Sequence, residues 1–280
     1  MLTSLTMIAF AANSILNRVA LANGDIDAVA FGVVRVCAGA VMLVGLVYLR
    51  RRPLSFGGPG RAVGVVSLLL YIFGFSLAYQ SLDAGLGALI LFGMVQITMF
   101  AGSLIGGERP ALQRWAGAIL AFGGLVWLLW PGQSAAPSLG HALLMAAAGI
   151  GWGVYSLNGR GTGDALGATA ANFALAAGIA VGVVIIAGMM GAGTSLASAS
   201  TFGFGMAILS GAVTSGLGYA LWYTVLPQLR GSTAAVAQLT VPVIAMAAGA
   251  VLLSEDLGMR LLIAALLVLG GVLIAVTSRR

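Results

Sequence analysis

The sequence GGERPALQRWAGAILAFGG, residues Gly106–Gly124, has a counterpart near the end of the chain in LSEDLGMRLLIAALLVLGG, residues Leu253–Gly271. In each segment a glutamate, Glu108 or Glu255, precedes a pair of glycines by 15 positions. Both glutamates come between two long apolar runs. In a chain with so few charged residues, this shared spacing indicates an internal repeat.

The composition places the repeat in a membrane. Hydrophobic residues make up 60% and charged residues 7% of the 280 positions, whereas about 25% of residues are charged in soluble domains. The apolar runs are continuous and about 20 residues long, as a membrane-spanning helix requires, and they do not alternate as the strands of membrane barrels do. We therefore predict an all-α polytopic membrane protein with ten transmembrane helices. The expected spans are 2–22, 26–49, 62–82, 84–106, 112–130, 138–158, 166–190, 201–225, 231–253 and 258–277.

The basic residues predict how these spans are oriented. If the N-terminus is cytoplasmic, ten arginines fall on the cytoplasmic side, namely Arg50, Arg51, Arg52, Arg61, Arg109, Arg114, Arg160, Arg230, Arg279 and Arg280. The opposite side then receives Arg260 and most of the acidic residues. Because cytoplasmic loops carry an excess of arginine and lysine, we expect both termini in the cytoplasm and the chain in the cytoplasmic (inner) membrane. This distribution also argues against nucleic acid as a partner.

The repeat divides the chain into residues 1–132 and 137–280, with five expected spans in each half. One offset aligns the two glutamates, the glycine pairs and also Met99 with Met246, without a gap. Because five is odd, the halves enter the membrane in opposite senses. Inverted repeats are an architecture of secondary transporters, whose substrate sites lie between the repeats near the midplane. Simple duplication in a structural membrane protein remains the alternative.

Several of these features together resemble a known family. They are the ten-span layout, Arg35 in the second span, the GER turn at Gly107–Arg109 and the glycine pair in the fifth span. The chain resembles the drug/metabolite transporter superfamily, in particular its EamA-type exporters, and is most similar to the YddG-type exporters of aromatic amino acids. The resemblance implies export of small metabolites. One departure is the ninth span, where QLTVPVIA keeps Pro242 but lacks the acidic residue that many relatives have before the proline.

Arg35 is the most informative polar residue within the expected spans. It lies nine residues into the second span, roughly 14 Å deep at 1.5 Å per residue, and no acidic residue is expected at that depth. Intramembrane charges usually have functional roles. Arg35 is therefore expected either to bind a substrate carboxylate or make the cavity electropositive, or to bind helix-end carbonyls and fix the packing.

Amides and aromatic rings accompany Arg35. Each has an alternative role in helix packing, but together they are typical of a mostly apolar pocket with a few polar groups. The predicted substrate-binding residues are Asn13, Arg35, Tyr79, Gln80, Gln96, Trp152, Tyr155, Tyr219, Tyr223 and Gln238. Pro227 and Pro242, with the glycine-rich segments around Gly85, Gly87 and Gly93 and around Gly211, Gly216 and Gly218, are expected to permit bending and to gate the cavity.

Three charged residues at the span ends are expected to have structural roles. Arg18, near the outer end of the first span, should extend to the membrane surface. Glu108 and Glu255 should each lie at a helix N-terminus, where the helix dipole favours a carboxylate. The glycine pairs that follow them should let the fifth and tenth spans pack closely.

The sequence offers no constellation for catalysis. We find neither a nucleophile with a nearby base nor a cluster of metal ligands, so we expect no enzyme activity, no metal and no cofactor. We predict a secondary transporter that moves small metabolites, amino acids with aromatic or other apolar side chains among them, outward by alternating access. The expected partners are the substrate and the bilayer, with the chain a monomer or a dimer. A solute or ion channel and a lipid-handling protein are the alternatives.

Overall fold

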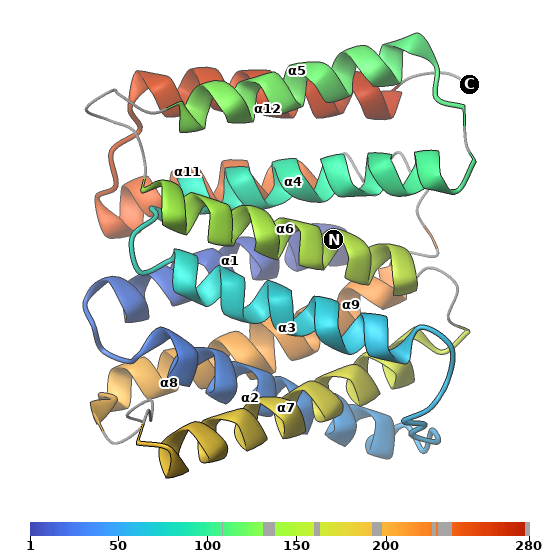
Figure 1. Ribbon diagram of the computed structural model, residues 1–280, viewed down its shortest axis with the longest axis vertical. Helices are drawn as coiled ribbons and strands as arrows, with labels where there is room; N and C mark the ends of the chain where they lie inside the picture. The colour runs from blue at the N-terminus through green and yellow to red at the C-terminus, as the bar shows by residue number, and fades with distance from the viewer. Residues whose placement is uncertain are drawn as a thin grey trace.

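The computed structural model describes residues 1–107, 109–130, 138–159, 163–191, 198–225, 228 and 237–277, and this part of the chain is helical without strands (Figure 1). Ten membrane-spanning segments follow one another. They are α1 (Leu2–Ala22), α2 (Ala28–Leu49), α3 (Arg61–Ala78), α4 (Ala84–Ile105), α5 (Leu112–Leu129), α6 (Leu139–Gly159), α7 (Ala165–Met189), the continuous α8 (Thr201–Leu209), η2 (Ser210–Leu217) and α9 (Gly218–Val225), then α11 (Thr240–Leu253) and α12 (Met259–Thr277).

The expected all-helical membrane fold is confirmed. Eight helical segments of the described chain are long and apolar enough to cross a membrane, while α6 and the 14-residue α11 complete the ten. Two ends differ. α11 begins at Thr240, and the start expected at residue 231 lies outside the described residues; α3 ends at Ala78 rather than at residue 82. There the amide of Tyr79 donates to the carbonyls of Phe75 and Leu77, and this tightened last turn reverses the chain towards α4.

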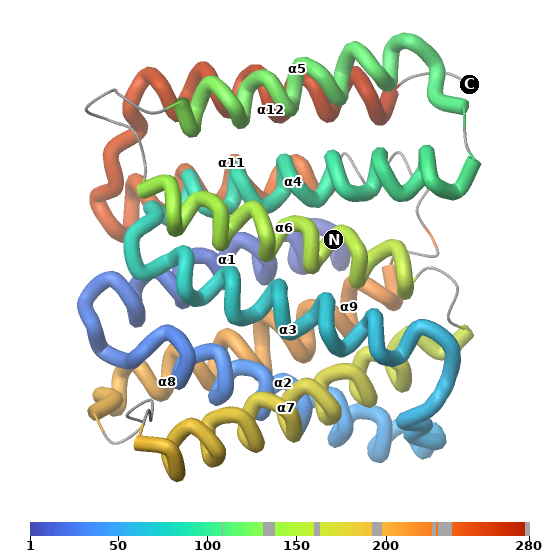
Figure 2. Tube along the Cα trace, viewed as in Figure 1, coloured from blue at the N-terminus to red at the C-terminus, as the bar shows by residue number. Residues whose placement is uncertain are grey.

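The helices pair as two inverted five-helix repeats. α5 packs on α12, α4 on α11 and α2 on α7, so that these helices each contact their repeat equivalent. α3 packs on α6, and the equivalent contact joins α1 with the segment α8–η2–α9. Figure 2 shows the α5–α12 pair at one end of the molecule and the α2–α7 pair at the other. The boundaries expected at 132 and 137, together with Glu108 and Pro227, lie outside the described residues.

The second glycine of each pair allows α5 and α12 to approach closely, as expected. A Cβ atom on Gly271 would lie 2.6 Å from both the Ala121 nitrogen and the Gly117 oxygen of α5. A Cβ on Gly124 would lie 2.8 Å from the Leu267 Cβ of α12. A Cβ atom on the first glycine of each pair, Gly123 or Gly270, would meet no described atom of a neighbouring helix within 4 Å. Only one glycine of each pair is therefore required for packing.

This asymmetry predicts different effects for substitutions at adjacent glycines. Gly271→Val should push α5 and α12 apart and destabilise the fold by about 1–3 kcal/mol, the usual cost of overpacking. Gly270→Val is the matched control and should leave stability unchanged. Thermal unfolding of the purified protein in detergent measures both, and equal melting temperatures for the two variants would contradict this account.

Candidate functional site

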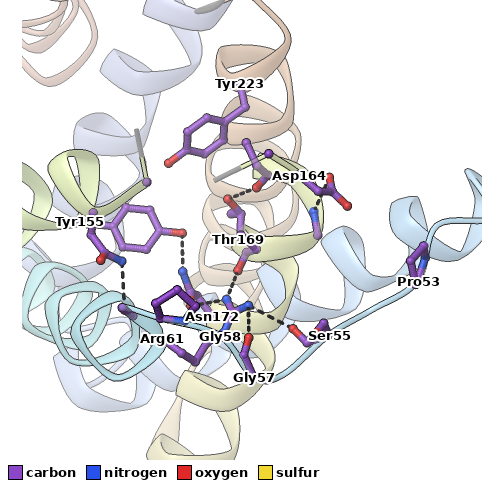
Figure 3. Close-up of a pocket in the computed structure, with 18 residues that line it drawn as sticks. Pro53, Ser55, Gly57, Gly58, Arg61, Tyr155, Asp164, Thr169, Asn172 and Tyr223 are labelled. Atoms are coloured by element: carbon purple, nitrogen blue, oxygen red, sulfur yellow. Dashed lines mark hydrogen bonds between the residues drawn. The ribbon is translucent and has the colours of Figure 1, made fainter. Parts of the chain in front are cut away.

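We call the end of the bundle where α1 begins and α12 ends the termini side, and the opposite end the far side (Figure 1). A cavity lies on the termini side. The cavity has a volume of about 300 Å³ and lies among the α2–α3 linker, α6, α7 and the end of α9. Tyr155 and Tyr223 line it together with Asn172 and Thr169, as Figure 3 shows. Two of the predicted substrate-binding residues therefore lie in one cavity.

Arg61 fixes the wall of this termini-side cavity. Its Nη1 donates to the Ala168 carbonyl at 2.7 Å and to Asn172 Oδ1 at 2.8 Å, and its Nη2 donates to two carbonyls of the α2–α3 linker. The Asn172 amide in turn donates to the Tyr155 hydroxyl at 3.4 Å. Because most of its donors bind protein acceptors, Arg61 organises the cavity wall rather than presenting a free charge.

Aromatic rings separate the cavity from the core of the bundle. Trp152, one turn deeper on α6, stacks on Tyr155 with ring centroids 5.6 Å apart and an interplanar angle of 20°. Trp152 also contacts Tyr219 at 4.8 Å and Tyr71 at 5.1 Å. We call Trp152, Tyr219 and Phe10, which contacts both of them, the aromatic layer. Through Trp152 the layer contacts both Tyr155, which lines the cavity, and Tyr71, which accepts from Arg35.

Arg35 lies beyond the aromatic layer and is fully buried. Its Nε donates to the Ser215 hydroxyl at 3.1 Å and its Nη2 to the Tyr71 hydroxyl at 2.9 Å. The guanidinium carbon lies 5.1 Å from the Tyr71 ring centroid and 5.0 Å from that of Phe75. Its Nη1 is buried without a hydrogen-bond partner, and within the described residues Arg35 forms no ion pair.

A π-helical turn places hydroxyl groups around this arginine. η2 carries Ser210, Thr214 and Ser215, all buried. Ser210 and Thr214 donate to Asn13 Oδ1 of α1 at 2.5 and 2.9 Å, while Ser215 accepts from Arg35. π-helical turns are rare and frequently occur at functional sites. Here the turn joins α1, α2 and the eighth span in one buried hydrogen-bond network.

The core holds almost no free volume in this arrangement. The space bounded by Asn13, Tyr71, Trp152 and Tyr219 measures about 10 Å³. A single water molecule needs a cavity of about 10–15 Å³ on this measure. The structure thus has a cavity on the termini side and a closed core.

The structure brings six of the ten predicted residues into this region. Asn13, Arg35, Trp152 and Tyr219 lie in the core, and Tyr155 and Tyr223 lie in the cavity.

The other four predicted residues lie elsewhere. Tyr79 is buried towards the far side, where its hydroxyl donates to the Ala84 carbonyl. Gln80 is exposed in the turn created by the early end of α3. Gln96 is half-buried on α4, and Gln238 is buried before α11. Neither Gln96 nor Gln238 lines the cavity or the core space described above.

Sequence reasoning missed four residues of the core, Tyr71, Ser210, Thr214 and Ser215. Tyr71 precedes Phe75 and Tyr79 at intervals of four, so the aromatic face of α3 was a usable signal. The three hydroxyl residues gave no such signal, because serine and threonine are also common packing residues in membrane helices.

A metal site has no support in the described part of the chain, where no three histidine, cysteine, aspartate or glutamate residues gather.

Comparison with known proteins identifies the family. The model of the EamA-like transporter family matches residues 1–130 and 139–277. An uncharacterized protein of Pseudomonas aeruginosa is 47% identical over 279 residues, which cover 100% of this chain and 94% of that protein. A solved crystal structure, 16% identical, matches 98% of this chain and 95% of its own with a TM-score of 0.68, which shows the fold alone. The chain belongs to the EamA-like transporter family, a family of membrane transporters of small solutes.

Proposed function

We propose that the protein is a secondary transporter that moves amino acids with aromatic or other apolar side chains, and related small carboxylates, out across the bacterial inner membrane. In this proposal the termini side is cytoplasmic and the substrate passes Arg35 by alternating access. The observation that carries the proposal is the buried Nη1 of Arg35, a cationic donor without a protein partner.

The electrostatics of Arg35 favour an anionic group as its missing partner. Burying an unpaired charge is expensive, and arginine within a membrane span usually faces a partner or a water-filled path. The hydroxyls of Tyr71 and Ser215 and the two aromatic faces compensate part of this cost. A substrate carboxylate is geometrically suited to the remaining donor, since guanidinium groups bind carboxylates through parallel hydrogen bonds.

The surroundings favour an aromatic or apolar side chain on that substrate. From the cavity inward the path is lined first by Tyr155 and Tyr223 and then by the aromatic layer. Aromatic rings provide large apolar contact area and also attract an ammonium group to their faces. A zwitterion with an apolar side chain thus finds a partner for each of its three parts.

The closed core supports a carrier rather than an open channel. The cavity of about 300 Å³ ends at the aromatic layer, and the space beyond measures about 10 Å³. A solute can therefore enter from the termini side before any path to the far side exists. This is the arrangement that an alternating-access carrier needs in its inward-facing state.

The role of Arg35 is testable with a matched pair of substrates. In proteoliposomes, Arg35→Gln should reduce transport of phenylalanine by a factor of about 150–5,000, because breaking a buried charge pair costs about 3–5 kcal/mol and each 1.4 kcal/mol is tenfold. Transport of phenethylamine, which lacks the carboxylate, should not fall. Arg52→Gln removes an exposed charge and is the control. Equal loss for both substrates, or no loss for phenylalanine, would contradict the assignment.

The same vesicles distinguish the classes of protein. A carrier gives saturable counterflow that is accelerated by substrate on the opposite side. Flux without saturation would indicate a channel, and lipid scrambling without solute flux would indicate a lipid-handling protein.

A further inference from the structure

A second charged cluster lies on the far side of the bundle. Arg18, near the end of α1, contacts Asp83 just before α4, with Nη2 and Oδ1 3.1 Å apart. Its Nε lies 3.4 Å from Oε1 of Glu255 in the α11–α12 linker. The side chains of Arg18, Asp83 and Glu255 are 20%, 43% and 8% exposed. The end of α1 and the start of α4, both in the first repeat, are thus joined to the α11–α12 linker of the second repeat.

Glu255 lies at a helix N-terminus, but that helix belongs to the other repeat. Both carboxylate oxygens accept from the Ala84 amide at 2.9 Å, so Glu255 caps α4 rather than α12. A carboxylate at this position is stabilised by the unpaired amides and the dipole of α4. Gly249 of α11 leaves the space that the carboxylate occupies, because a Cβ there would overlap Oε2.

Close backbone contact reinforces this junction. A Cβ on Gly85 of α4 would lie 2.7 Å from Cα of Met246 on α11. Arg18 also donates to the Tyr79 carbonyl at 3.4 Å, and the Tyr79 hydroxyl donates to the Ala84 carbonyl at 3.1 Å. The far-side ends of α1, α4 and α11 are therefore held together by a few polar contacts and by one tight helix crossing.

We propose that Arg18, Asp83 and Glu255 form an ionic latch that closes the far side of the transporter and must open for each substrate molecule to leave. This inference rests on the alternating access proposed above. The cavity lies on the termini side, and in this proposal the path to the far side opens where the ends of α4 and α11 separate. The contacts of the latch hold these helix ends together, and they must break when the ends separate.

The chemistry of the latch suits repeated opening. Asp83 and Arg18 remain partly exposed, so water replaces their contacts when they part. Burial raises the pKa of the Glu255 carboxyl above its usual range, with a further contribution from Asp83, even though the Ala84 amide and Arg18 act in the opposite direction. The closed arrangement thus holds a carboxylate whose charged form is incompletely compensated.

Thiol labelling from the far side tests the latch without requiring transport. Ser14 is buried one helical turn deeper than Arg18 on α1, and Ser14→Cys in a Cys37→Ala background reports access to the core. In intact cells, Arg18→Gln and Glu255→Gln should each increase the rate of labelling by a membrane-impermeant maleimide about tenfold, the effect of losing one charge-assisted contact.

Arg52→Gln is the matched control for labelling. It breaks the exposed Arg52–Asp164 ion pair on the termini side, and exposed pairs contribute little to stability. The proposal predicts no change in labelling for this variant. It is overturned if neither latch variant increases labelling, or if Arg52→Gln increases it equally.

A reversible crosslink provides a second test if the latch variants fail to fold. The Cβ atom of a cysteine at Gly249 would lie 3.6 Å from the Ala84 Cβ, within the roughly 3.5–4.5 Å of a disulfide, and only the end of the Glu255 side chain must move to make room for it. Ala84→Cys with Gly249→Cys, in the Cys37→Ala background, should transport when reduced and fall to background when oxidised. Each single variant should be insensitive to oxidation.

The outcomes of the crosslink separate the two proposals. Transport by the oxidised double variant would overturn the latch, because the joined helix ends could not have separated. Absence of solute transport by the reduced protein and by the parent would instead contradict the proposed function, and the labelling rates would still decide the latch.

Discussion

The pairing of each repeat with its inverted copy is the constraint on which the structure depends. Because each half has five spans, equivalent helices run in opposite directions and meet as the antiparallel pairs α5–α12, α4–α11 and α2–α7. The α5–α12 pair is locked by backbone contact at Gly271. The α4–α11 pair ends at a polar junction instead, where Glu255 caps α4. In the proposed cycle the α5–α12 pair stays together, whereas the far-side ends of α4 and α11 separate.

Much of the fold follows from the sequence because the bilayer imposes simple rules. A span must be about 20 apolar residues long, and this rule places nine of the ten expected starts and nine of the ten expected ends within two residues of the structure. The exceptions are the end of α3 at Ala78 and the start of α11 at Thr240. The π-helical turn η2 has no such rule, since its hydrogen bonds to Asn13 and Arg35 depend on tertiary contacts.

The site was less predictable than the fold, because its contacts depend on how the two repeats pack against each other. Arg35 stood out because a charge within a span is rare, and Trp152 and Tyr219 stood out by size. Gln80 was predicted as a polar residue within the third span, but α3 ends at Ala78, and Gln80 is therefore exposed in the turn that follows. Glu255 was correctly expected at a helix N-terminus, but only the folded chain shows that this helix is α4. Contacts between repeats are set by packing, which periodicity and hydropathy do not encode.

The two barriers on either side of Arg35 differ in chemistry, and this difference is consistent with the order of events in transport. The aromatic layer consists of non-directional ring contacts, which a substrate side chain can replace as it enters. The proposed far-side latch consists of directional charged contacts at the opposite end of the bundle from the cavity. In the proposed cycle, entry requires only repacking of the rings, whereas exit requires the ionic contacts to break. A substrate carboxylate bound at Arg35 would pair the buried charge, and this pairing would lower the free-energy cost of keeping that charge in a closed core.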